Sequence, residues 1–215
     1  MVRMTVVVGV VCLLLAASAL VQGAPIGFPQ HPPDIVSENI SVSYDPTTDS
    51  FTATGMARRY NQPPLHDIDL AADTFSLSAI IDGNGVASSG LVTILGGIPD
   101  LSIPGGSTLL TGSLYQFGFE PDGYRTPPDP LGPGSFYFVC TVTGGELAAD
   151  YGGVGKAFEV LLNTSDVFSG KFDSPFNAVG AAADTYYIPE PASFSILAAG
   201  LLAAYARRRR RNASR

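Results

Sequence analysis

Apolar and polar residues alternate at every second position through most of the chain, and this period constrains the fold more than any other feature. In residues 35–44 one face carries Val36, Ile40, Val42 and Tyr44, and polar residues take most of the positions between them. A period of two places successive side chains on opposite faces of a β-strand with one buried face. The pattern therefore predicts a strand over residues 35–44.

The same alternation recurs between clusters of turn residues. Asp45-Pro46-Thr47-Thr48-Asp49 and Gly83-Asn84-Gly85 are typical of turns within hairpins. Further strands are predicted at residues 51–57, 74–82, 86–95, 108–119, 135–143, 157–163 and 168–172. No long amphipathic helical pattern separates them, so the expected fold class is all-β. Short strands at these spacings favour a single antiparallel β-sandwich or jelly-roll-like domain over a closed barrel.

The first 23 residues are typical of a secretory signal peptide. Arg3 precedes an apolar run at residues 6–21, and small residues follow. Cleavage is expected after Gly23, with Ala19 as the alternative, and Cys12 leaves with the peptide. The exported domain is then expected at residues 24–176, which is long enough for one hydrophobic core.

The exported part is strongly acidic. Residues 24–188 hold five basic and eighteen acidic residues, a formal charge of −13. This charge argues against nucleic acid as a partner, because phosphate binding needs clustered Lys and Arg. Cys140 is the one cysteine of this part, and it alternates with Phe136, Phe138 and Val142. It is therefore expected as a small buried residue rather than as a nucleophile.

The chain ends in three consecutive features. Residues 177–184 are small and weakly patterned, so residues 177–187 are expected to form a stalk. Pro189, Glu190 and Pro191 follow. The prolines hold the backbone around Glu190 extended and accessible, which suits a protease. Residues 192–206 form a 15-residue stretch without charge. As a helix it is about 22 Å long, short but sufficient for a thin membrane.

An arginine-rich tail, residues 207–215, follows the apolar stretch and predicts its orientation. It begins with five consecutive basic residues, Arg207, Arg208, Arg209, Arg210 and Arg211. Because basic residues stay on the cytoplasmic side, the tail is expected inside and the domain outside. The alternative is an ordinary single-span anchor with a proline-bearing stalk.

This C-terminal arrangement, over residues 188–211, resembles the PEP-CTERM sorting signal of bacterial envelopes. In that family a Pro-Glu-Pro motif, a short hydrophobic helix and an arginine-rich end are processed by exosortase, a membrane-embedded cysteine transpeptidase. The resemblance implies transient binding to exosortase, anchoring in the inner membrane before processing at or near Pro189, Glu190 and Pro191, and a cell-surface or extracellular destination afterwards. It also implies a host that often makes extracellular polysaccharide, which is a possible partner.

Residues suited to catalysis or metal binding are few. Histidine occurs only at His31 and His66, and no recognised catalytic or nucleotide-binding motif is present. His66-Asp67-Ile68-Asp69 with Asp73 is a generic polar stretch. Residues 82–85 resemble the start of a calcium loop, but the later ligands are missing, so a hairpin turn is expected. Tyr115, Tyr124 and Tyr137 are candidate sugar platforms, and residues 120–134 are either a binding loop or a surface crossover.

These observations lead us to expect an exported, non-catalytic protein of the cell surface or extracellular matrix, with no cofactor, metal or catalytic residue. Two alternatives from other classes remain open. A carbohydrate- or calcium-binding module would need an exposed aromatic strip or a carboxylate cluster. A cell-surface hydrolase, the less favoured of the two, would need two acids at a definite separation in a groove.

Overall fold

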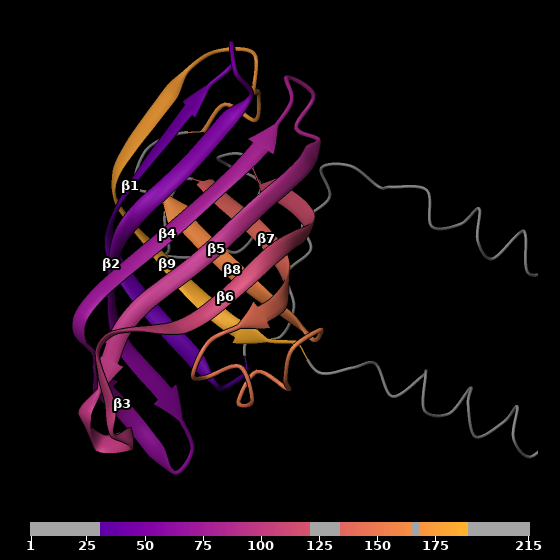
Figure 1. Cartoon of the computed structure of the whole chain (residues 1–215). Coiled ribbons are helices and arrows are strands. Elements are labelled where there is room, and N and C mark those ends of the chain that lie inside the picture. Colours follow the sequence, from indigo (N-terminus) through magenta and orange to yellow (C-terminus); the bar gives the residue numbers. More distant parts are fainter. Residues whose placement is uncertain (1–30, 121–133, 165–167, 189–215) are drawn as a thin grey trace, which may run out of the picture.

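Strands make up almost all of the regular structure. The computed structural model describes residues 31–120, 134–164 and 168–188, except for the side chains of residues 65–67, 72 and 180. These residues form the following elements (Figure 1): β1 (Asp34–Asp45), β2 (Ser50–Gln62), β3 (Leu65–Asp69), β4 (Ala71–Ile81), β5 (Ala87–Ile98), the 3-10 helix η1 (Pro99–Leu101), β6 (Ile103–Glu120), β7 (Gly134–Gly144), β8 (Ala157–Thr164) and β9 (Phe176–Tyr187). The predicted all-β class is confirmed.

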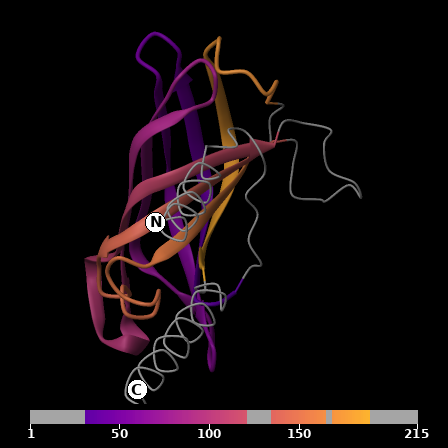
Figure 2. The same cartoon turned by 90° about the vertical axis from the view of Figure 1, so that its right-hand side faces the viewer.

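Eight of the strands close into an antiparallel barrel. Their hydrogen-bonded order is β1-β9-β8-β7-β6-β5-β4-β2, and β2 pairs again with β1. Asp34 of β1 stands opposite Asn61 of β2 on one side and Tyr186 of β9 on the other. Seen from the side, the first and last strands lie together in the wall (Figure 2). The prediction of a sandwich or jelly roll is therefore wrong, because a sandwich leaves its sheets open where this sheet joins its own first strand.

The strand that closes the barrel is the segment that was expected to be a stalk. β9 pairs with β1 and with β8, for example through Val36↔Asp184 and Leu161↔Asp184. Its inward residues Ala178, Ala181 and Ala183 are at most 4% exposed. These alanines belong to the hydrophobic core, but their small side chains do not give β9 the strongly apolar pattern of a usual strand.

The predicted strand at residues 168–172 is also wrong. These residues lie in the connection between β8 and β9, outside regular structure. Phe168 and Phe172 are 5% and 1% exposed and insert their rings into the core from this connection. These residues are apolar because their side chains are buried in the core, although their backbone does not pair with a strand.

A bulge changes the inward face of β1. The registers of β1 with both neighbours shift near Asn39, whose φ is 54°, in the left-handed region. Ile40, Val42 and Tyr44 point inward as predicted. On the other side of the bulge the alternation is reversed, so that Ile35 and Ser37 are fully buried and Val36 is only half-buried.

Aromatic rings fill one half of the barrel interior. Phe136 is the centre of this cluster, with ring centroids 5.3 Å from Phe51, 4.9 Å from Phe168 and 6.0 Å from Phe176. Tyr44 packs edge-on against Phe172 at 5.1 Å. The rings from the connection before β9 thus close this end of the barrel.

The connection between β7 and β8, residues 145–156, closes the opposite end. Its Leu147 and Tyr151 are 1% and 0% exposed. The Tyr151 hydroxyl lies 2.9 Å from Oγ1 of Thr185 on β9, and the Tyr60 hydroxyl of β2 lies 2.8 Å from Oδ2 of Asp150. These contacts tie the connection to strands on two sides of the barrel.

Several predicted segments lie outside the described residues: the signal peptide at 1–23, most of the loop at 120–134, the apolar stretch at 192–206 and the tail at 207–215. Among the residues that the structure does describe, none forms a helix long and apolar enough to cross a membrane.

Candidate functional site

The outer wall of the barrel carries two adjacent rows of hydroxyl side chains that cross several strands. We call these two rows the hydroxyl array. One row runs from β1 to β7 through Ser43, Thr52, Ser78, Leu91, Ser113 and Thr141. The other runs from β1 to β6 through Ser41, Thr54, Ser76, Thr93 and Thr111. Leu91 is the one member without a hydroxyl group.

The alternation of each strand places these hydroxyls outside. On β2, Phe51 and Ala53 are fully buried, so Thr52 and Thr54 beside them point away from the core. On β4, Leu77 and Ala79 are 2% and 4% exposed, and Ser78 between them is exposed. The register of the barrel then aligns the outward positions of neighbouring strands into rows.

The spacing of the array follows from strand geometry. Neighbouring strands lie about 4.8 Å apart, and residues two apart along a strand are separated by about 6.6 Å. Successive strands rotate by about 20–25°, so the array wraps around the barrel rather than forming a plane. Within the described part of the chain, the hydroxyls of Ser43, Thr52, Ser78 and Ser113 make no hydrogen bond. They are therefore available to a partner.

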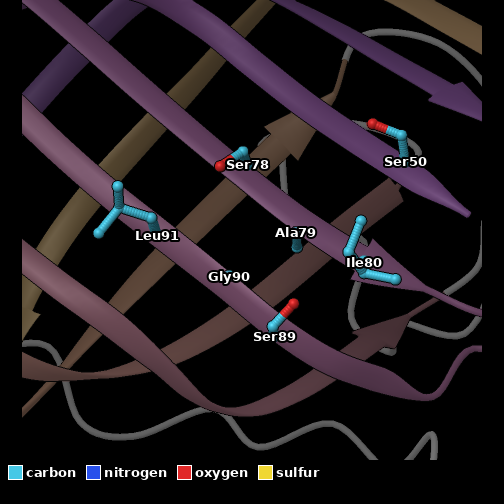
Figure 3. Close-up of a pocket in the computed structure, with 7 residues that line it drawn as sticks. All are labelled: Ser50, Ser78, Ala79, Ile80, Ser89, Gly90 and Leu91. Carbon is cyan, nitrogen blue, oxygen red and sulfur yellow. The ribbon is translucent and has the colours of Figure 1, made fainter.

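A shallow hollow adjoins the array at β2, β4 and β5. It has a volume of about 290 Å³, and Figure 3 shows the residues around it, which are Ser50, Ser78, Ala79, Ile80, Ser89, Gly90 and Leu91. Ile80 and Leu91 are 41% and 51% exposed. The hollow thus combines three serine hydroxyls with two exposed aliphatic side chains.

The array and the hollow hold no charged side chain. The nearest charges in the registers lie at their margins, where Asp45 stands opposite Ser50 and Glu38 opposite Met56. Glu38 forms an exposed ion pair with Arg59 at 3.8 Å. The members of the array and the hollow are therefore neutral. Burial raises the pKa of Tyr44, and three acids at one edge of the hollow raise it further: Asp49, Asp82 and Asp45.

On the β7–β9 side the outer wall carries buried aromatic and aliphatic side chains in place of exposed hydroxyls. Tyr137, Leu161 and Tyr186 form a small cluster outside the main core, and each is at most 6% exposed. Burial raises the pKa of Tyr186, and the neighbouring Asp184 carboxylate raises it further. Burial also raises the pKa of Asp184. This side therefore lacks the open hydroxyl character of the array.

Residues 82–85, which resemble the start of a calcium loop, form a hairpin turn, as expected. Oδ1 of Asp82 accepts hydrogen bonds from the backbone N–H groups of Asn84 and Val86, both at 2.9 Å. These bonds hold the pKa of Asp82 below its usual value. The carboxylate thus stabilises its own turn.

The His66–Asp69 stretch lies on β3, which pairs with the end of β2 rather than forming a loop. Asp69 is exposed, and the side chains of His66 and Asp67 are not among those described. Among the described residues, no group of three or more His, Cys, Asp or Glu side chains is arranged to hold a metal ion.

The structure separates the candidate tyrosines. Tyr115 is 75% exposed on β6, Tyr137 is 4% exposed, and Tyr124 lies outside the described residues. The structure therefore does not bring them together as an aromatic strip. Cys140 is buried, which confirms that prediction, and burial raises its pKa to about 12.

The array could not be recognised from any one strand. Alternating Ser and Thr are visible in the sequence at residues 41–43, 52–54 and 76–78. Such residues are common on solvent-facing strands. Their alignment depends on the register between strands, which the local pattern does not show. One signal could have indicated the array. Several successive predicted strands have no charged residue at their outward positions, and this can be counted from the sequence.

Comparison with known proteins identifies a sorting motif directly after β9 in the sequence. Residues 188–211 match the family model described as the PEP-CTERM protein-sorting motif. The chain thus carries this motif, as its C-terminal residues predicted, and the motif implies an exported protein that exosortase processes at the membrane. Pro189, Glu190 and Pro191 and the five arginines fall within the match. No curated protein and no solved structure matches the chain.

Proposed function

We propose that this chain is a non-catalytic protein of the cell surface or extracellular matrix, and that its barrel associates with neutral extracellular polysaccharide through the hydroxyl array. The observation that carries the proposal is the alignment of outward Ser and Thr residues across β1, β2, β4, β5 and β6. The sorting motif supports export, which would bring the barrel to where such polymers accumulate.

The chemistry of the array favours a neutral polymer. Each Ser or Thr hydroxyl can donate one hydrogen bond and accept others, which matches the hydroxyl groups of a sugar. Exposed Ile80, Leu91 and Tyr115 offer apolar contacts for the C–H faces of sugar rings. The charge of −13 on residues 24–188 repels polyanions, whereas a neutral chain has no such penalty.

The array also favours weak binding at many points. It is an open, wrapped surface without a deep cleft among its residues, so each sugar unit makes few contacts. Single hydroxyl hydrogen bonds add about 1 kcal/mol each. Many such contacts along one polymer increase the overall affinity through effective concentration. This mode suits a structural component of a matrix.

Affinity electrophoresis tests the proposal. The purified barrel would migrate through native gels that contain a neutral β-glucan, and through parallel gels that contain alginate as a polyanion. We expect retardation by the glucan alone. We also expect the retardation to persist between 50 and 500 mM salt, because no ion pair contributes.

A double substitution locates the binding face. Thr52→Ala with Ser78→Ala removes two hydroxyls from one row, and the apparent dissociation constant should rise by roughly tenfold or more at about 1 kcal/mol per bond. The matched control is Ser169→Ala with Ser174→Ala, at exposed positions of the connection before β9. Equal weakening by both pairs, or retardation by alginate alone, would contradict the proposal.

We further propose that exosortase removes the C-terminal tail and that the barrel then reaches the cell surface or the medium. Intact-mass measurement of the protein from its own host tests this step. A mass that ends near residues 189–191, and that is lost when the exosortase gene is deleted, is the expected result. A mass that runs through Arg215 in normal cells would support a simple membrane anchor instead.

A further inference from the structure

The sorting motif follows the barrel without a spacer. β9 ends at Tyr187, and the matched motif begins at Ile188. The backbone N–H of Ile188 donates to the carbonyl of Ala157 at the start of β8, at 3.3 Å. The ring of Tyr187 lies against the 145–156 connection, since a Cβ built on Gly152 would be 2.8 Å from it. The folded body therefore extends to the first residue of the motif.

The distance from the barrel to the membrane is consequently short. Only Pro189, Glu190 and Pro191 separate Ile188 from the apolar stretch that begins at residue 192. A fully extended chain covers at most about 3.6 Å per residue, so the four steps from residue 188 to 192 span no more than about 14 Å. β1 has 12 residues, and with a typical strand tilt it gives a barrel about 30 Å tall. This tether, residues 188–192, is therefore shorter than the barrel is tall.

The antiparallel order identifies which end lies near the tether. β9 ends where β7 ends and β8 begins, and where β5 ends and β6 begins. That end therefore carries η1, the 145–156 connection and the β2–β3 hairpin (Figure 1). The turn at Asp82–Val86, between β4 and β5, lies at the other end. Leu101 and Val154, 37% and 68% exposed, are apolar residues at the tethered end.

Charge does not account for an attraction between this end and lipid. The 145–156 connection holds two acids, Glu146 and Asp150, and one base, Lys156, and the acid Asp100 of η1 is exposed at the same end. These elements together are acidic, so anionic headgroups would repel them. Any contact between this end and the membrane is thus imposed by the tether rather than by affinity for lipid.

We propose that, before processing, the barrel stands on the membrane with its 145–156 end against the lipid surface and its Asp82–Val86 end directed away. Val154 lies at the headgroups in this orientation, and exosortase must reach a motif whose first residue, Ile188, is still bonded to the barrel. The inference rests on the predicted membrane span at residues 192–206. It does not depend on polysaccharide binding.

Site-specific quenching tests the orientation in the full-length precursor. Val154→Cys and Asn84→Cys would be made separately in a Cys12→Ser background and purified from host membranes that lack exosortase. Cys140 is 1% exposed and stays unlabelled in the folded protein. Each thiol would carry bimane, and the precursor would be placed in phosphatidylethanolamine–phosphatidylglycerol nanodiscs with nitroxide-labelled headgroups.

We expect strong quenching of the label at residue 154 and little at residue 84. A control precursor with twenty Gly and Ser residues inserted between Ile188 and Pro189 should lose most of this difference, because the longer linker frees the barrel to reorient. Equal quenching at both positions without the insert, or stronger quenching at residue 84, would overturn the proposal. Release of the unprocessed precursor by alkaline extraction would overturn it as well, since its tail would then not span the membrane.

Discussion

Gly112 is a position where the absence of a side chain makes room for the core. It lies on β6, and a Cβ built there would contact the ring carbons of Phe158 and lie 3.1 Å from Cβ of Cys140. Phe158 is fully buried and packs against Tyr151, with ring centroids 5.8 Å apart. The ring therefore has little room to move away.

We expect Gly112→Ala to lower the free energy of unfolding by about 1–3 kcal/mol through overpacking. Urea unfolding, followed by circular dichroism, measures the change. Gly83→Ala is the control, because the nearest atom to its built Cβ is the carbonyl oxygen of Phe172 at 3.8 Å. A similar loss in both variants would mean that the ring of Phe158 is not the cause.

The Cys140 thiol should be inert in the folded protein. It is 1% exposed, and burial raises its pKa to about 12, so the reactive thiolate is scarce at neutral pH. Iodoacetamide at pH 8 should leave the mass of the native exported protein unchanged and add one alkyl group in guanidinium. Complete alkylation under native conditions would show that the β7 wall opens readily.

At the scale of single residues, the alternating pattern predicted the inward side of Cys140 and of Ile40, Val42 and Tyr44. Near the start of β1 the prediction was wrong, because Ile35 points inward there and Val36 does not. The cause is the bulge at Asn39, which inserts an extra residue and reverses the alternation. A bulge depends on both neighbouring strands, so one strand's sequence does not locate it.

Among the elements, β9 determines whether the sheet closes. Ala183 is fully buried on its inner face, whereas Ala182 beside it is half-exposed. We expect Ala183→Asp to cost on the order of 3–5 kcal/mol, because it buries an unpaired charge. Ala182→Asp should cost far less. Thermal unfolding of the two variants would distinguish a strand, which responds differently at these positions, from a stalk, which responds equally and weakly at both.

The connection at residues 145–156 should depend on Tyr60 for its order. The Tyr60 hydroxyl lies 2.6 Å from Oε1 of Gln62 and 2.8 Å from Oδ2 of Asp150. Burial raises its pKa, as does the hydrogen bond to Asp150, so the hydroxyl remains protonated and able to donate.

Tyr60→Phe should therefore lower the stability by about 1–3 kcal/mol, since a buried hydrogen bond is lost. Proteolytic cleavage within residues 145–156 should also become faster, as measured by limited digestion and mass spectrometry. Tyr115→Phe, at a residue that is 75% exposed, serves as the control and should change neither quantity. An unchanged cleavage rate in Tyr60→Phe would mean that other contacts hold the connection.

Most strands could be predicted from the sequence because their apolar residues alternate over several positions between turn residues. Strand β3 was not predicted, because its sequence is a generic polar stretch. The other two errors, at residues 168–172 and 177–187, concern segments whose composition did not indicate whether they pair. Phe168 and Phe172 are apolar because their rings close one end of the barrel, although their backbone lies outside the sheet. The inward alanines of β9 are small, although β9 pairs with strands on both sides. Each segment was assigned from its own composition, which reports how apolar its side chains are. Whether the segment forms a strand depends on the strands that it meets in the folded barrel.

For the whole molecule, net charge should influence stability. Residues 24–188 carry a formal charge of −13, and a compact barrel holds these charges closer together than an unfolded chain does. Raising NaCl from 10 to 500 mM screens this repulsion and should move the urea midpoint upward. KCl should have the same effect at equal ionic strength. A midpoint that falls with salt would instead indicate that attractive ion pairs dominate.

At the same scale, the sequence predicted export, sorting and an all-β domain, because each depends on local patterns. It did not predict closure, which requires residue 34 to meet residue 186, nor the hydroxyl array, which requires six strands in register. Both are properties of pairing across long sequence separations. The hydroxyl rows of the candidate site are therefore aligned only in the folded barrel.

The pairing of the first strand with the last also governs timing. A chain that crosses a membrane unfolded and N-terminus first delivers β1 early and β9 late, and a barrel whose wall lacks β9 has two open edges. Closure must wait until residue 187 has emerged, because β9 ends there. In such a chain the barrel cannot close, and so cannot block translocation, until the sorting motif is next to cross.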